Sequence, residues 1–168
     1  YSTLSDIDKT VLKLSILMHD SGKKEGVVDD GHEYSSTDYA KSILERYRFP
    51  ADVKRRITDI ISNHHWFAKF NTYKIDALDV AHMCRDNGTF KIMQIMAKAD
   101  FENVNDSGFQ YIRTNTNNKK EYDKYMRNKF DEVDKARRSI NKYSSMFYNS
   151  RLVVKGKYPK QNVIANGR

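Results

Sequence analysis

The chain has 168 residues, 39% of them hydrophobic and 31% charged, a mixture typical of one globular domain with a buried core. It contains no apolar run near the roughly 18 residues that cross a bilayer, and its first residues do not resemble a signal peptide. The single cysteine, Cys84, cannot form a disulfide within the chain, so we expect a cytoplasmic protein without a membrane span.

The first predicted helix runs from Ser5 to Met18. Ser5 followed by Asp8 resembles a capping box in which Asp replaces the usual Glu. Gly22 then ends the helical pattern, and residues 21–31 are predicted to form a loop. One face of this helix carries apolar residues at spacings of three and four: Leu4, Ile7, Val11, Leu14 and Met18.

Four further helices are predicted before residue 105. Pro50 separates the second from the third, and Gly88 is a natural C-cap for the fourth. Thr89 is predicted to cap the fifth, which extends to about Val104. The expected ranges of the second, third and fourth helices are 36–47, 51–66 and 77–86.

A long amphipathic helix is predicted after a polar stretch at 114–120. Its apolar residues recur at every seventh position: Met126, Val133, Ile140 and Phe147. A coiled-coil partner would explain this repeat, but we expect the helix to pack along its own domain. No segment alternates with period two, so the predicted fold class is all-α. We expect a helical core at 1–112, the long helix at 113–150 and a basic tail at 151–168.

The net charge of +8 arises in the C-terminal part of the chain. Nine of the 30 basic residues and none of the 22 acidic residues lie from Lys135 onward, so the preceding part is close to neutral. This basic helix and tail could attract nucleic acid or a phosphorylated partner. The alternative interpretation is a solvated helix end.

A histidine next to an aspartate, His19 and Asp20, stands at the end of the first predicted helix. An imidazole nitrogen and a carboxylate oxygen suit a divalent transition ion, and a carboxylate can bridge two ions. A His-Asp dipeptide alone is a weak signal, because chance produces it often.

Further candidate ligands follow along the chain. His32 comes after a glycine in the predicted loop, and His64 and His65 are adjacent near the end of the third helix. His64 continues the apolar stripe of that helix, so it should point inward. Asp100 shares the apolar face of the fifth helix, where a carboxylate needs a partner such as a metal ion or a lysine. Each histidine taken singly is more often a hydrogen-bonded core or surface residue, an interpretation that we keep for His82.

The order of these residues resembles the HD superfamily of metal-dependent phosphohydrolases. The similarity covers about residues 4–105 and is nearest to the HD domains attached to nucleotidyltransferases. Four segments carry it: 17–23 (LMHDSGK) resembles the HD-x-x-K segment, 30–32 (DGH) the loop histidine, 63–66 (NHHW) the paired histidines, and 95–100 (IMAKAD) the closing alanine-aspartate helix.

This resemblance implies an HD-like helical bundle that hydrolyses a phosphoester or phosphoanhydride of a nucleotide or a nucleic-acid end. It implies one or two divalent ions (Mn, Fe, Co, Ni or Mg) that activate water near neutral pH. Lys23 would offset charge on the phosphoryl oxygens, unless it is an ordinary exposed lysine. The implied ligands are His19, Asp20 and Asp100 for a first ion, and His32, His64 and His65, with Asp20 as the bridge, for a second.

The chain departs from the family pattern at one point. The family usually contributes another metal-binding histidine from a helix before the His-Asp pair, and residues 1–18 contain none. Because the chain begins with Tyr1, we expect that such a helix has been removed; an incomplete ligand set is the alternative. The competing hypothesis is a non-catalytic HD module that binds a nucleotide, nucleic acid or protein, and a third is a domain of a larger enzyme whose chemistry lies elsewhere.

Overall fold

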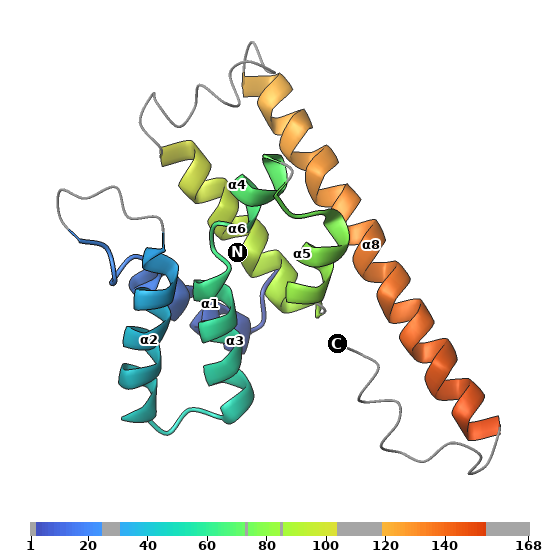
Figure 1. The fold of residues 1–168 in the computed structure, drawn as a ribbon, viewed down its shortest axis with the longest axis horizontal. Coiled ribbons are helices and arrows are strands. Elements are labelled where there is room, and N and C mark those ends of the chain that lie inside the picture. Colours follow the sequence, from blue (N-terminus) through green and yellow to red (C-terminus); the bar gives the residue numbers. More distant parts are fainter. Residues whose placement is uncertain (1–2, 25–30, 73, 85, 104–118, 154–168) are drawn as a thin grey trace.

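The computed structural model describes residues 3–24, 31–72, 74–84, 86–103 and 119–153; at 101–103, 119 and 145–153 it describes the backbone alone. Every regular element in these ranges is a helix (Figure 1), so the predicted all-α class is confirmed. None of the described helices combines the length and the apolar character that crossing a bilayer requires. The helices are α1 (Asp6–Met18), α2 (His32–Glu45), α3 (Ala51–Ser62), α4 (Trp66–Asn71), α5 (Ala77–Met83), α6 (Asn87–Asn103) and α8 (Lys119–Val153).

The start of α1 follows the prediction. The Ser5 hydroxyl accepts a hydrogen bond from the Asp8 amide at 3.1 Å, which satisfies one of the free donors of the first turn. The predicted apolar face is wrong at Ile7, whose surface is 59% exposed. Leu4 is buried, but it lies before the first residue of α1. The helical spacing of three residues therefore does not require Ile7 to lie on the same face as Leu4. Val11 and Met18 of the predicted face are buried as expected, and Leu12 joins them.

α2 and α3 lie side by side as a helical hairpin (Figure 1) and pack against α1. α2 begins at His32, one turn earlier than predicted, so His32 is its first residue and not part of a loop. The preceding Gly31 has φ 137°, a backbone conformation that favours glycine and turns the chain into the helix.

α3 ends at Ser62 and not at Trp66, because the backbone leaves the helical conformation at Asn63. The Asn63 side-chain amide donates to the carbonyl of Asp59 at 2.8 Å, which satisfies an acceptor that the ended helix leaves free. Residues 63–65 therefore form a turn between α3 and α4, and the paired histidines lie in this turn.

The boundary between α5 and α6 also differs from the prediction. α5 ends at Met83, and Gly88 lies in the first turn of α6 and does not end α5. The carboxylate of Asp86 accepts a hydrogen bond from the Thr89 amide at 2.8 Å, so Asp86 takes the capping role predicted for Thr89. A Cβ atom at Gly88 would lie 2.5 Å from Asp8 Oδ1 and 2.9 Å from Arg56 Nη2, so a larger residue there would displace these two side chains.

The core is centred on Trp66, which is 1% exposed. Its indole N–H donates to the carbonyl of Met93 on α6 at 3.3 Å. Its ring lies 5.4 Å from Phe67, 6.3 Å from Phe70 and 5.9 Å from Phe130 of α8, measured between centroids. Trp66 thereby joins α4, α6 and α8, and it also fixes the end of the histidine turn that precedes it.

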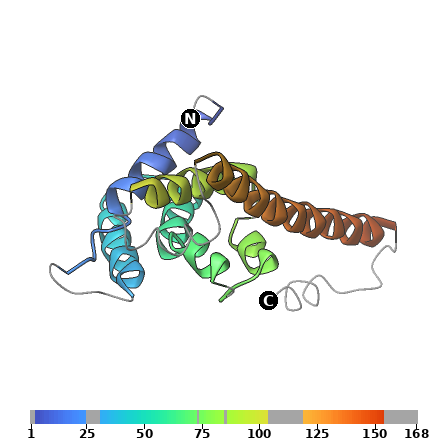
Figure 2. The same cartoon turned by 90° about the horizontal axis from the view of Figure 1, so that it is seen from above.

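α8 packs on the bundle only along its first part. Met126 and Val133 are buried, Ile140 is partly buried and Tyr143 is 66% exposed. The helix then continues past the other helices (Figures 1 and 2). The side chain of Phe147, the last member of the predicted repeat, lies outside the described residues.

An ion pair with little exposure joins α1 to α3. Arg56 Nη2 donates to Asp8 Oδ1 at 2.5 Å, and the two side chains are 14% and 17% exposed. Arg56 Nε also donates to Thr89 Oγ1 at 3.0 Å, which connects the pair to α6. Burial alone raises the pKa of Asp8, but the hydrogen bonds from Arg56 and Ser5 outweigh it and hold that pKa below 3.8.

Arg56→Met should lower the free energy of unfolding by about 3 kcal/mol, because it leaves the Asp8 carboxylate without its partner in a mostly buried position. Arg55→Met is the matched control. Arg55 pairs with Asp59 at 3.2 Å, but both side chains are exposed, so the loss should stay under about 1 kcal/mol. Urea unfolding measures both, and equal losses would contradict the prediction.

The same pair predicts a pH dependence. The folded-state pKa of Asp8 lies below its ordinary value of 3.8, so the stabilisation is present above pH 3.8 and is lost as the pH falls below it. The difference in stability between the wild type and Arg56→Met should therefore shrink in urea unfolding below that pH. A difference that stays constant would show that the ion pair is not its source.

Candidate functional site

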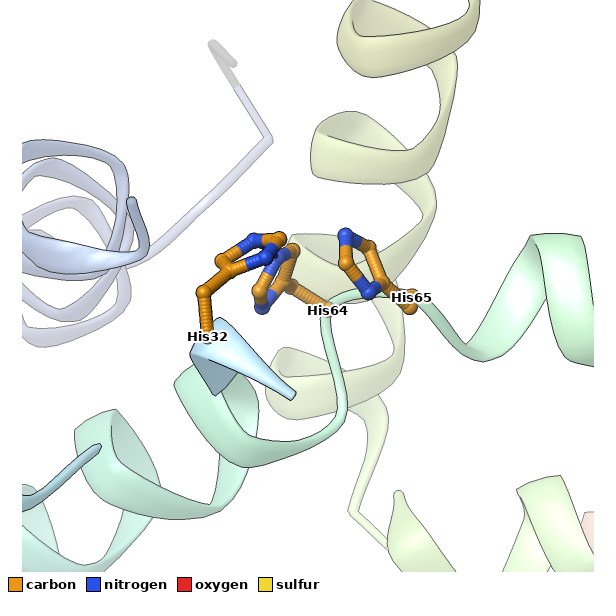
Figure 3. A group of neighbouring side chains, drawn as sticks. All are labelled: His32, His64 and His65. Carbon is orange, nitrogen blue, oxygen red and sulfur yellow. Dashed lines mark hydrogen bonds between the residues drawn. The ribbon is translucent and has the colours of Figure 1, made fainter. Parts of the chain in front are cut away.

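Four segments that are distant in the sequence bring the six predicted ligands together. His19 and Asp20 follow the end of α1, and Asp100 lies near the end of α6. The start of α2 and the turn before α4 supply the other three, His32, His64 and His65, which Figure 3 shows gathered in one place. Because the imidazole rings of His19 and His64 lie 5.2 Å apart, the two parts form one cluster.

His19 lies between two carboxylates. Its Nε2 is 3.3 Å from Asp20 Oδ2 and 3.8 Å from Asp100 Oδ1. Its Nδ1 lies 2.8 Å from the carbonyl of Ile16 in the last turn of α1. A carbonyl can only accept, so this Nδ1 carries the proton, and Nε2 is the ring nitrogen that faces the two carboxylates.

His64 is held in the same way. Its Nδ1 donates to the carbonyl of Ile61 at 2.6 Å, which leaves Nε2 with a lone pair. That Nε2 lies 3.3 Å from His32 Nε2 and 3.8 Å from Asp20 Oδ1. Burial lowers the pKa of His64 from 6.5 to about 4, so the ring is neutral at physiological pH, as a metal ligand must be.

Asp20 Oδ1 is a buried oxygen that accepts no hydrogen bond. It lies 3.2 Å from His32 Nε2, and the lone pair of His64 also faces it. Leaving a buried carboxylate oxygen without a donor is costly. A cation bound between this oxygen and the surrounding nitrogens would remove that cost, so the residues present fit a metal ion.

The donor set indicates which kind of ion fits. The ligand atoms of His32, His64 and His65 all lie within 4.8 Å of one another, which suits a three-nitrogen site. Imidazole is a ligand of first-row transition ions, whereas magnesium prefers oxygen. The group with His19 and Asp100 has one nitrogen and two carboxylates, and such a mixed set also accepts manganese or iron.

The carboxylates influence each other. Burial raises the pKa of Asp100, and the nearby charge of Asp20 raises it further, against the effect of His19. Burial also acts to raise the pKa of Asp20, but a hydrogen bond from Lys23 and the charge of His19 outweigh it, so that pKa is lowered. Two neighbouring carboxylates that both face one imidazole are an arrangement that a divalent cation stabilises.

Lys23 lies at the exposed side of the cluster. Its Nζ donates to Asp20 Oδ2 at 2.6 Å, while 52% of its side chain is exposed. The predicted lysine therefore contacts the His-Asp pair and is open to solvent, so a molecule bound at the cluster could reach it.

Gly22 sets the position of this turn against α2. Its amide donates to Ser36 Oγ at 2.9 Å. A Cβ atom at Gly22 would lie 2.4 Å from the backbone nitrogen of Ser36 and 2.6 Å from Cβ of Ser35. Only glycine allows the segment that carries His19 and Asp20 to approach the start of α2 so closely, and this approach brings Asp20 to His32.

One residue beside the cluster, Glu33, was missed in the sequence. Glu33 follows His32, is 6% exposed, and is paired with Lys69 of α4 at 3.2 Å. Its position next to the candidate ligand His32 could have indicated a role. Because residues up to 31 were predicted as a loop and the helix was expected to begin at 36, the inward direction of Glu33 in the first turn of α2 was not predicted. His82 lies elsewhere, in a hollow that Arg56 and Asp86 also line.

No protein-family model, no curated protein and no solved structure matches this chain.

Gly22→Ala should lower the free energy of unfolding by about 1 to 3 kcal/mol, because the methyl group overlaps the backbone of α2 and the turn must move. Ser21→Ala is the control in the same turn. It removes one hydrogen bond from an exposed hydroxyl to the carbonyl of Met18 and should change stability by about 1 kcal/mol or less. Chemical denaturation tests both, and an unchanged Gly22→Ala would contradict the close packing of the turn on α2.

Proposed function

We propose that this protein is a metal-dependent phosphohydrolase of the HD type that acts on a phosphoester of a nucleotide or of a nucleic-acid end. One observation carries the proposal. The buried Asp20 Oδ1 accepts no hydrogen bond and faces imidazole nitrogens from two other segments of the chain. This is the arrangement expected of a carboxylate that bridges two ions.

The residues would divide into two groups around Asp20. His19 and Asp100 would hold a first ion with it, and three protein ligands leave positions open for water and substrate. His32, His64 and His65 would hold a second ion on its other oxygen. When bound, such ions would make water a nucleophile near neutral pH and would polarise a phosphoryl oxygen.

Lys23 would act on the substrate side. Its ammonium group now pairs with Asp20, and its exposed stem allows it to turn toward a phosphoryl oxygen. There it would offset the charge that develops as the bond to phosphorus breaks. Lys23 also competes with a cation for Asp20, so its removal should not weaken metal binding.

A second candidate function is a non-catalytic module that binds a nucleotide, nucleic acid or protein. The absence of a histidine from residues 1–18 favours it, because the first ion would then lack a ligand that the HD family usually supplies. The two candidates differ in turnover: the module would bind metal and ligand without releasing product.

Asp20→Ala and Asp100→Ala should each abolish metal-dependent phosphohydrolysis and keep the helix content, because each removes a carboxylate ligand. Lys23→Ala should reduce turnover by about 10-fold and keep the metal, since its half-exposed charge is partly screened. Metal content, circular dichroism and phosphate release from a panel of nucleotides with several divalent ions measure these effects.

His82→Ala is the control, because it replaces a histidine outside the cluster, and its activity should remain close to that of the wild type. Activity retained in Asp20→Ala would exclude the metal mechanism. Metal bound by the wild type without turnover of any nucleotide or nucleic-acid end would favour the binding module.

We further propose that the basic part of α8 contacts the nucleic-acid backbone. Lys135 and Arg138 are exposed, although other residues of the same turns still pack on the bundle, and Arg138 pairs with Asp134 at 3.0 Å. Arg137 is different: its side chain is 10% exposed, donates to Asn87 of α6 at 2.8 Å and stacks on the ring of Phe90. Arg137 therefore belongs to the packing of α8, although the sequence grouped it with the binding charges.

Lys135→Gln combined with Arg138→Gln should flatten the salt dependence of single-stranded nucleic-acid binding. The slope of log K against log salt concentration should fall in magnitude by about 0.7 per lost phosphate contact. Lys124→Gln, an exposed lysine on the first part of the same helix, is the control and should leave the slope unchanged. Fluorescence anisotropy at several salt concentrations measures the slope. If the slope survives the double substitution, the basic segment is a solvated surface.

A further inference from the structure

Glu33 has one carboxylate oxygen in use and one without a donor. Oε1 accepts a hydrogen bond from Lys69 Nζ at 3.2 Å. Oε2 is buried, accepts no hydrogen bond and lies 3.8 Å from Nδ1 of His65. The side chain is 8% exposed, so water does not readily supply the missing donor. A buried anion with a free acceptor beside an imidazole requires an explanation.

Glu33 lies beside the three histidines, in contact with one of them. The ligand atoms that lie within 4.8 Å of one another belong to His32, His64 and His65, and Glu33 is not in that group. Its carboxylate instead lies beside the Nδ1 of one member. The backbone carbonyls of Ile16 and Ile61 hold the Nδ1 atoms of His19 and His64, and Glu33 takes the corresponding place for His65.

Metal-binding histidines usually donate their second ring N–H to a carboxylate or a carbonyl, which fixes the tautomer and the orientation of the ring. A small rotation of the His65 ring would bring Nδ1–H from 3.8 Å into hydrogen-bond range of Oε2. Lys69 binds Oε1 of the same carboxylate at 3.2 Å, which leaves Oε2 as the acceptor that faces His65.

We propose that Glu33 is a positioning residue: its Oε2 accepts the Nδ1–H of His65, so that His65 offers Nε2 to an ion held by the three histidines. The inference rests on the proposed function, because it concerns the second of the two ions. Lys69 keeps the carboxylate in place but is not part of the contact with His65.

The test uses Co²⁺ alone and follows each binding event by calorimetry and by the visible absorption of the ion. Glu33→Gln should weaken the affinity for the second ion by about 10- to 100-fold and leave the affinity for the first ion unchanged. Lys69→Met removes the same ion pair from Glu33 but keeps the carboxylate, so it should leave both affinities within a few-fold. Glu45→Gln, an exposed glutamate at the other end of α2, is the matched control.

A second measurement needs no variant. Long-range proton–nitrogen NMR of the wild type should show His65 with the proton on Nδ1, and this result would stand even if Glu33→Gln folded poorly. A His65 proton on Nε2 would overturn the inference, as would two unchanged affinities in Glu33→Gln or an equal loss in Lys69→Met.

The two proposals fail in different ways. A wild type that binds no Co²⁺ would remove the proposed function and the inference with it. A wild type that binds two ions, with Glu33→Gln binding both equally well, would remove only the role of Glu33.

Discussion

The carboxylate of Asp20 lies where three separate parts of the chain meet, and its contacts constrain each of them. One oxygen is close to His19 and Lys23 from its own turn, and the other faces His32 and His64 from α2 and from the turn before α4. A charge in this position stabilises the fold only if positive charge accompanies it. Lys23 supplies part of that charge, and a metal ion is the second source that the geometry accommodates.

Rigid packing around the cluster determines how well such an ion could be held. Trp66 is fully buried and bonded to α6, so the adjacent His64 and His65 start from a fixed point of the core. Backbone carbonyls orient two of the imidazoles, and Gly22 allows the His-Asp turn to approach α2. The site is thus positioned by helix ends and a tight turn, which leave less freedom than a long loop.

The long helix combines two roles along one amphipathic sequence. Near Val133 it closes the core, and the buried Arg137 connects it to α6 through Asn87 and Phe90. Further along, Arg138 and Lys142 are exposed. The charge excess of the C-terminal part therefore cannot all serve binding, because one of its arginines is used to hold the helix in place.

The sequence alone determined the helical class, the cap at Ser5 and the residue types of the candidate site, because periodicity and capping are local properties of the chain. The predicted start of α2 and the predicted end of α3 were wrong. Each boundary is set by one residue, Gly31 at φ 137° before α2 and the capping side chain of Asn63 after α3, and periodicity does not detect single residues. Only the tertiary structure decided that Asp20 faces two histidines from other segments and that Glu33 lies behind His65. Those contacts depend on how helices pack, which no local pattern specifies.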